Sequence, residues 1–165
     1  SAASLSRLPY PMTHIRPGLG LYGIDPRNRG RAPLRPVLSW KSRILVVRNI
    51  RRGETVSYGA TFRAPRDLRV ATVGTGYADG LPFSLGNRGH ALLRGRLCPI
   101  IGRVTMDMTL LDVTALPAAQ RGDEVVWIGR SGTKVRTAND LAREAGTIPW
   151  EIFTRIAPRI PRLYS

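Results

Sequence analysis

One tyrosine stands where a predicted strand ends, in the stretch VSYGATF at Val56–Phe62. A phenol has an ordinary pKa of about 10, so Tyr58 can act as an acid or a base at neutral pH only where its surroundings are tuned. Nearby arginines could lower that pKa. A tyrosine that precedes a glycine is nevertheless more often a packing residue than a catalytic one. The residues alone leave both interpretations of Tyr58 open.

A second candidate is the stretch IRPGLGLYG at Ile15–Gly23. A strand that ends in Gly-X-Gly exposes backbone N–H groups, and such groups can hold a phosphate. In barrels of alternating strands and helices, phosphates are often bound at the loops after the last two strands. Arg16 would then lie near whatever the phosphate carries. The alternative is an ordinary turn, because glycines also mark turns.

The glycine-rich stretch VGTGYADGLP at 73–82 resembles a phosphate-binding loop only superficially. It lacks the P-loop lysine, and no helical pattern follows it as a dinucleotide-binding fingerprint would require. We predict a structural loop that holds Tyr77 and Asp79 in tight geometry.

The stretch GRVTMDM at 102–108 places Arg103, Met106 and Asp107 at the end of a strand. A single carboxylate such as Asp107 cannot form a metal site, and no histidine is near. A methionine in this position is usually a core residue.

The sequence gives little support for a metal site, a disulfide bond or a membrane-spanning segment. His14 and His90 are far apart and have no partners at metal-ligand spacing, so we predict no metal site. Cys98 is the single cysteine and cannot form an internal disulfide. It precedes a proline in an apolar segment, which favours a small buried hydrophobe over a nucleophile. No apolar run is long enough to cross a bilayer. The single cysteine fits a reducing compartment, so a cytoplasmic location is expected.

The formal net charge of +15 results from 26 lysines and arginines and 11 aspartates and glutamates. Only Lys41 and Lys134 are lysines. A basic chain can bind phosphate backbones without regard to sequence. Here the arginines are scattered through every segment, with no RNA-recognition signature and no zinc-finger spacing. This distribution favours an arginine-rich solvated surface over a nucleic-acid partner.

The elements that must position these residues are mainly strands. Residues 37–50 alternate and are rich in β-branched side chains, which predicts a long strand. Further strands are predicted at 68–76, 90–94, 97–104, 108–113 and 124–128. Short strands between marked turns indicate an antiparallel barrel or sandwich, so the fold class is mostly β.

Two short helices are predicted after the strands. Thr137 and Asp140 form a capping-box pattern, and Gly146 can end the first helix. The second runs from about Pro149 to near Pro158. Ahead of the β region, residues 14–24 are predicted to form a strand that ends in a glycine-rich loop, and residues 25–36 a linker.

Taken together, the motifs resemble one family. The segments IRPGLGLYGI, SYGATFRAPRDLRVATVGTGYADG, NRG, GRVTMDMTLLDVT, GDEVVWIG and RIAPRIPRLY occur in the order found in alanine racemase. That family interconverts L- and D-alanine with pyridoxal 5'-phosphate, and supplies D-alanine for peptidoglycan. The resemblance implies an antiparallel β-barrel-like domain with short helices at 37–165. It also implies that 1–36 is the remnant of a (β/α)8 barrel and a crossing linker.

The resemblance also implies roles for individual residues. Tyr58 corresponds to the catalytic tyrosine, and Arg16 to the arginine beside the pyridine nitrogen of the cofactor. Cofactor phosphate contacts are implied for Ser1, Gly18 and Leu19. Substrate contacts or a place in the pocket and its access channel are implied for Met106, Tyr77, Arg103 and Asp107. Trp150 stands where the family commonly has a phosphate-binding tyrosine, and Phe83 where many members have an arginine.

In the family, two subunits share each active site, so the resemblance implies a homodimer with alanine as the substrate. The β domain of one subunit serves the barrel of the other. The family's cofactor lysine and mid-barrel arginine have no counterpart in this sequence. We therefore expect the N-terminal half of the barrel to be missing, and the chain to be inactive by itself.

Two alternatives stay open at this stage. Phe83 and Trp150 allow a broad-specificity racemase that acts on serine or lysine. A stand-alone basic β domain that binds nucleic acid would account for the charge.

Overall fold

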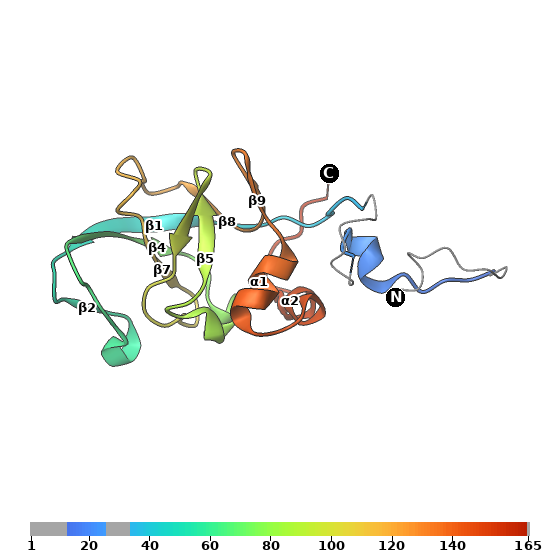
Figure 1. Cartoon of the computed structure of the whole chain (residues 1–165), viewed down its shortest axis with the longest axis horizontal. Helices are drawn as coiled ribbons and strands as arrows, with labels where there is room; N and C mark the ends of the chain where they lie inside the picture. The colour runs from blue at the N-terminus through green and yellow to red at the C-terminus, as the bar shows by residue number, and fades with distance from the viewer. Residues whose placement is uncertain (1–12, 26–33, 165) are drawn as a thin grey trace. The chain divides into compact units, whose positions relative to one another are not determined.

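The computed structural model describes residues 13–25 and 34–164, which divide into two compact units, Ser1–Leu38 and Ser39–Ser165 (Figure 1). Ser1 and most of the predicted linker lie outside the described residues. The boundary between a barrel remnant and a β domain, placed at 36/37 from the sequence, stays a prediction.

The first unit contains a short 3-10 helix, η2 (Gly18–Tyr22). Gly23 ends the helix with φ +75°, and a Cβ there would lie 1.9 Å from the carbonyl oxygen of Arg35. Only glycine fits this close approach. The predicted strand at 14–24 is wrong within the described residues. A strand needs a neighbour to accept its backbone hydrogen bonds, and no described strand pairs with this stretch.

The second unit is an antiparallel sheet of seven strands with the order β6-β5-β8-β1-β4-β7, and β9 pairs with β8. The strands are β1 (Trp40–Ile50), β4 (Leu68–Val73), β5 (His90–Leu93), β6 (Arg96–Pro99), β7 (Thr109–Asp112), β8 (Glu124–Ser131) and β9 (Lys134–Arg136). A separate hairpin pairs β2 (Thr55–Val56) with β3 (Phe62–Arg63). The prediction of a mostly β antiparallel fold is confirmed.

The sheet curves until its two edges meet. Just after β6, Ile100 forms a bridge with Leu111 of β7, and the Ile101 N–H donates to the carbonyl oxygen of Leu110 at 3.0 Å. The long strand β1 makes this curvature, because its first part pairs with β8 and its second part with β4, with register shifts along the way. The result is the barrel-like sheet that the strand pattern indicates.

The core lies between these strands and under the helices. Val70 and Val73 on β4 and Val125, Val126 and Trp127 on β8 have no exposed surface. An antiparallel strand with one solvated face would alternate, so the consecutive buried residues of β8 mean that both of its faces are covered.

Two helices, α1 (Ala138–Ala145) and α2 (Pro149–Arg155), lie together beside the sheet (Figure 1). Thr137 and Asp140 make the reciprocal capping box, and Gly146 ends α1 with φ +74°. α1 therefore begins where its capping box predicts, and α2 begins at Pro149, whose fixed φ suits the first helical position. α2 ends at Arg155, ahead of the predicted end near Pro158.

Candidate functional site

Tyr58 stands at the tip of the β2–β3 hairpin, in the 3-10 turn η3 (Tyr58–Ala60). Its side chain is 75% exposed, so the packing interpretation is wrong within this chain. Ser57, immediately before it, has φ 65° and ψ 172°. Non-glycine residues in this region of backbone space store about 1–3 kcal/mol of strain. Such strain persists only where the surroundings hold the residue in place.

Those surroundings come from the loop at 102–103. The Ser57 hydroxyl donates to the carbonyl oxygen of Arg103 at 2.9 Å. Gly102, with φ +73°, lies so close that a Cβ on it would be 2.6 Å from the Ser57 Cβ. The Arg103 guanidinium lies over Gly59, at 3.2 Å from where a Cβ would be. The tyrosine turn therefore rests on the backbone and side chain of the next candidate loop.

Asn87 joins the same two loops from one side. Its Oδ1 accepts the Gly102 N–H at 2.6 Å, and its Nδ2 donates to the Thr61 hydroxyl at 3.2 Å. Asn87 has φ 57°, a conformation that asparagine tolerates better than most residues. The sequence indicates only a turn here, because the partners of Asn87 are far away along the chain.

Tyr77 begins the 3-10 turn η4 (Tyr77–Asp79), which lies against the loop that carries Met106. The Tyr77 N–H donates to the Thr105 carbonyl at 2.9 Å, and the Ala78 N–H to the Met106 carbonyl at 3.0 Å. Asp79 is buried and accepts the Gly76 N–H at 2.9 Å. The tight geometry predicted for this glycine-rich loop is confirmed.

These loops line an open cavity of about 620 Å³. It is lined by all five residues predicted for catalysis and substrate binding in the β domain: Tyr58, Tyr77, Arg103, Met106 and Asp107. Phe83 also lines it, with its ring edge-on to Tyr77 at a centroid distance of 6.3 Å. Met106 is 54% exposed, so the interpretation of this methionine as core is wrong. The structure places these side chains together, and their roles stay predictions.

Tyr58 also lines a second cavity, of about 580 Å³. Its apolar walls come from Val46, Met108 and Leu110, and Arg48 supplies the one charged side chain of its lining. Tyr58 thus lines both cavities, and the charged side chains of Arg103 and Asp107 belong to the first of them.

The remaining titratable candidates are structural. Burial raises the pKa of the Cys98 thiol to about 11, in keeping with an unreactive buried hydrophobe.

No cluster of three metal-ligating side chains occurs among the described residues. No helix in the described ranges is long and apolar enough to cross a membrane.

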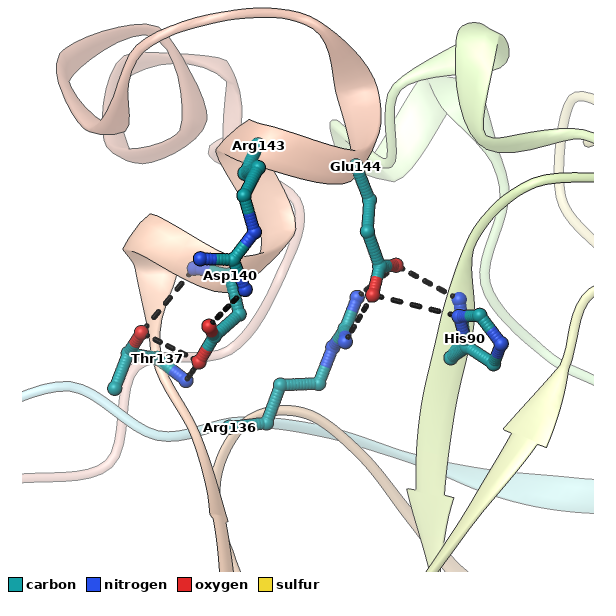
Figure 2. A network of polar contacts seen from close by, with 6 residues as sticks. All are labelled: His90, Arg136, Thr137, Asp140, Arg143 and Glu144. Carbon is teal, nitrogen blue, oxygen red and sulfur yellow. Dashed lines mark hydrogen bonds and ion pairs between the residues drawn. The ribbon is translucent and has the colours of Figure 1, made fainter.

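His90 has a partner that the sequence does not reveal. Glu144 on α1 accepts two hydrogen bonds from the buried Arg136 and one from the His90 backbone N–H, and the His90 ring lies 3.4 Å from the same carboxylate (Figure 2). Burial would raise the pKa of Glu144, but the hydrogen bonds and charge of Arg136 outweigh it, and the pKa lies below its ordinary value. This network fastens α1 to the sheet.

Comparison with known proteins decides the family. The domain described as "Alanine racemase, C-terminal domain" matches residues 37–164. The chain belongs to the alanine racemase family. It is 46% identical to the alanine racemase of Sorangium cellulosum over 99% of this chain and 45% of that protein. It is 43% identical to the Halothermothrix orenii enzyme over the whole of this chain and 44% of that protein.

Solved alanine racemases have the same fold. The Bartonella henselae enzyme, solved with covalently bound pyridoxal phosphate, superposes with a TM-score of 0.84 at 36% identity, over 90% of this chain and 40% of that one. The Bacillus anthracis enzyme with bound L-Ala-P gives 0.80 at 35% identity, over 87% and 37%. This chain therefore spans less than half the length of the racemases that it matches.

The residues for which cofactor contacts are predicted are divided between the two units. Arg16, Gly18 and Leu19 belong to the first, where Gly18 and Leu19 open the helix η2. Trp150 belongs to the second unit, in the first turn of α2, and is 44% exposed. Ser1 lies outside the described residues.

Proposed function

We propose that the complete protein containing this chain is an alanine racemase, and that this chain supplies Tyr58 as the proton carrier on one face of the substrate. The observation that carries the proposal is the single cavity lined by Tyr58, Tyr77, Arg103, Met106 and Asp107 in a member of this family. D-alanine for peptidoglycan and a place in the bacterial cytoplasm belong to the same proposal.

Racemisation needs a base on one face of the α-carbon and an acid on the other. Tyr58 suits one of these positions because its turn is braced by Ser57 and its phenol projects from the hairpin tip. A proton carrier fixed in direction lowers the barrier by prior positioning. The second carrier and the cofactor lysine are expected in the part of the relatives that this chain does not span.

The first unit provides a partial fit for the cofactor phosphate. The first N–H groups of a helix lack acceptors within the helix, and Gly18 and Leu19 occupy this place in η2. Gly18 has φ +57° and no side chain to obstruct an approaching phosphate. Arg16, two residues before Gly18, would supply a permanent positive charge beside the pyridine nitrogen of the cofactor. When bound, pyridoxal phosphate supplies an electron sink for the pair left on the α-carbon.

The substrate carboxylate is assigned to the loop at 105–108. Met106 would meet it with its backbone N–H, and Arg103 and Asp107 would line the pocket around it. We further propose that a second copy of the protein completes each active site, as the family resemblance implies.

The exposed ring of Phe83 at the cavity favours a second candidate, a racemase of broader range that also accepts serine or lysine. Rates on a panel of L-amino acids separate the two. A rate for serine or lysine equal to that for alanine would favour the broader enzyme.

The decisive experiment is Tyr58→Phe in the complete protein, with Tyr164→Phe as the control, because Tyr164 is 91% exposed near the C-terminus. We expect racemisation to fall by at least about 100-fold, the usual contribution of an acid–base group. In deuterium oxide the variant should keep α-proton exchange for one enantiomer of alanine and lose it for the other. Wild-type racemisation by Tyr58→Phe would refute the assignment.

A further inference from the structure

The chain that follows α2 returns to the candidate site. The Ala157 N–H donates to the carbonyl oxygen of Asp79 at 3.0 Å. Two residues later, the guanidinium of Arg159 donates through Nε to Asp79 Oδ1 at 2.8 Å and through Nη2 to Asp107 Oδ1 at 2.7 Å. One side chain therefore joins carboxylates from two separate loops.

The two carboxylates belong to the loops that carry the candidate substrate residues. Asp79 ends the turn that begins with Tyr77, and Asp107 directly follows Met106. Asp79 is only 6% exposed, and its other oxygen is occupied by the Gly76 N–H. It is thus a fixed anchor, whereas Asp107 is on the exposed cavity rim.

The backbones of these segments are in close contact. A Cβ on Gly76 would lie 2.2 Å from the Thr105 carbonyl oxygen, and a Cβ on Gly80 would lie 2.2 Å from the Arg155 carbonyl oxygen. The Tyr77 turn therefore packs directly against both the end of α2 and the Met106 loop. A change in the position of one segment must move the next.

We propose that Arg159 is a positioning residue that sets the spacing between the Tyr77 turn and the Met106 loop. The planar guanidinium presents several donors in a fixed arrangement, so it can hold two carboxylates at a set separation. The hydrogen bonds that Arg159 donates to Asp107 and Asp79 raise its pKa above the usual range, so the bridge stays charged. The consequence for catalysis rests on the proposed function, because it requires Met106 and Tyr77 to contact substrate.

The test compares Arg159→Lys with wild type in the complete protein. Lysine keeps the positive charge near buried Asp79, but it is a single point charge and cannot reproduce the fork that spans both loops. The matched control is Arg155→Lys, whose guanidinium pairs with Glu151 on the surface of α2. The readouts are hydrogen–deuterium exchange followed peptide by peptide, and steady-state kinetics with alanine.

For Arg159→Lys we expect faster exchange in peptides covering 74–81 and 103–109, where the Tyr77 and Ala78 amides bond across the loops. Peptides from β4 and β8 should be unchanged. KM for alanine should rise on the order of 10-fold with a smaller change in kcat, because a displaced Met106 amide weakens substrate and transition state alike. Arg155→Lys should behave as wild type.

Several outcomes overturn the proposal. Unchanged exchange in both peptides would mean that Arg159 does not set the loop spacing. Faster exchange everywhere, including β4 and β8, would indicate a merely structural role. Faster exchange in these two peptides with an unaltered KM for alanine would mean that the spacing of the loops does not affect substrate binding. If the wild-type protein shows no racemase activity, the proposed function fails, and the exchange pattern still decides the positioning role.

Discussion

The Ser57 hydroxyl donates a 2.9 Å hydrogen bond to the carbonyl oxygen of Arg103, and this bond ties the turn that presents Tyr58 to the loop that carries Met106 and Asp107. The two residues are separated by 46 positions in the chain. Ser57 has a strained backbone conformation, and its side-chain hydrogen bond helps to hold it there. Because Ser57 directly precedes Tyr58, the direction of the Tyr58 phenol depends on this residue.

Replacement of Ser57 should separate the bond from the strain. Ser57→Ala removes the hydrogen bond and keeps a Cβ at φ 65°, so we expect a loss of about 1 kcal/mol in unfolding free energy and a lower kcat/KM. Ser57→Gly also removes the bond but relieves the strained conformation, and should be more stable than the alanine variant. Urea denaturation measures both. Equal stability of the two variants would show that the strain is not stored at Ser57.

Asn87 should matter for the same pair of loops through two different bonds. Asn87→Asp keeps an acceptor for the Gly102 N–H but loses the donors to Thr61, whereas Asn87→Gly loses both and tolerates φ 57°. We expect a cost of about 1 kcal/mol per bond lost, so the glycine variant should be the less stable of the two.

Exposed Arg88, the next residue, offers a control, since Arg88→Gln should leave the thermal midpoint close to wild type. Thermal denaturation of the three variants gives the comparison. A glycine variant as stable as wild type would mean that the bridge contributes nothing.

The strands and helices could be predicted from the sequence because their signals are local. The β-branched residues of β1 and the capping box at Thr137 are signals carried by residues a few positions apart. The predicted strands that overrun their ends most are those through Gly76 and Val104, which the structure ends at Val73 and Pro99. At both points the chain leaves the sheet to form the site loops, and short-range patterns do not record that departure.

Only some of the residues that form the candidate site could be predicted from the sequence. Resemblance selected Tyr58, Tyr77 and Met106, but Asn87 and Arg159 were missed, because each acts through contacts with residues distant in the sequence. A glycine in a turn gives some warning of such contacts. Gly102 is marked by its need for φ +73°, yet the Ser57 side chain that fills the space beside it is known only from the fold.

Gly102→Ala should therefore lower the free energy of unfolding for two reasons, the positive φ and the clash with Ser57. Gly53→Ala tests the first reason alone. Both glycines have positive φ, +73° and +87°, but a Cβ at Gly102 would meet Ser57 at 2.6 Å, while one at Gly53 has nothing within 4 Å. We expect Gly53→Ala to cost about 1 kcal/mol from backbone strain, and Gly102→Ala to cost on the order of 2–4 kcal/mol. Chemical denaturation measures both, and equal losses would contradict the predicted clash.

The Glu144 network predicts how stability depends on pH. Its pKa is lowered in the folded protein from an ordinary 4.5, so over the acid range the unfolded state binds more protons. The stabilisation is therefore fully present above about pH 5 and is lost as the pH falls through the folded pKa. The groups that face the carboxylate are Arg136 from β9 and His90 from β5 (Figure 2).

Glu144→Gln removes the titrating group and keeps an amide oxygen that can accept from Arg136. We expect it to be less stable than wild type at pH 7, because buried Arg136 loses its counter-charge, and to lose less stability than wild type between pH 5 and pH 3. Urea midpoints at both ends of that range provide the measurement. Glu54→Gln is the control, since that carboxylate lies on an exposed turn and accepts a hydrogen bond from the Arg51 N–H. Parallel pH profiles for wild type and Glu144→Gln would mean that another carboxylate, not Glu144, governs the acid limb.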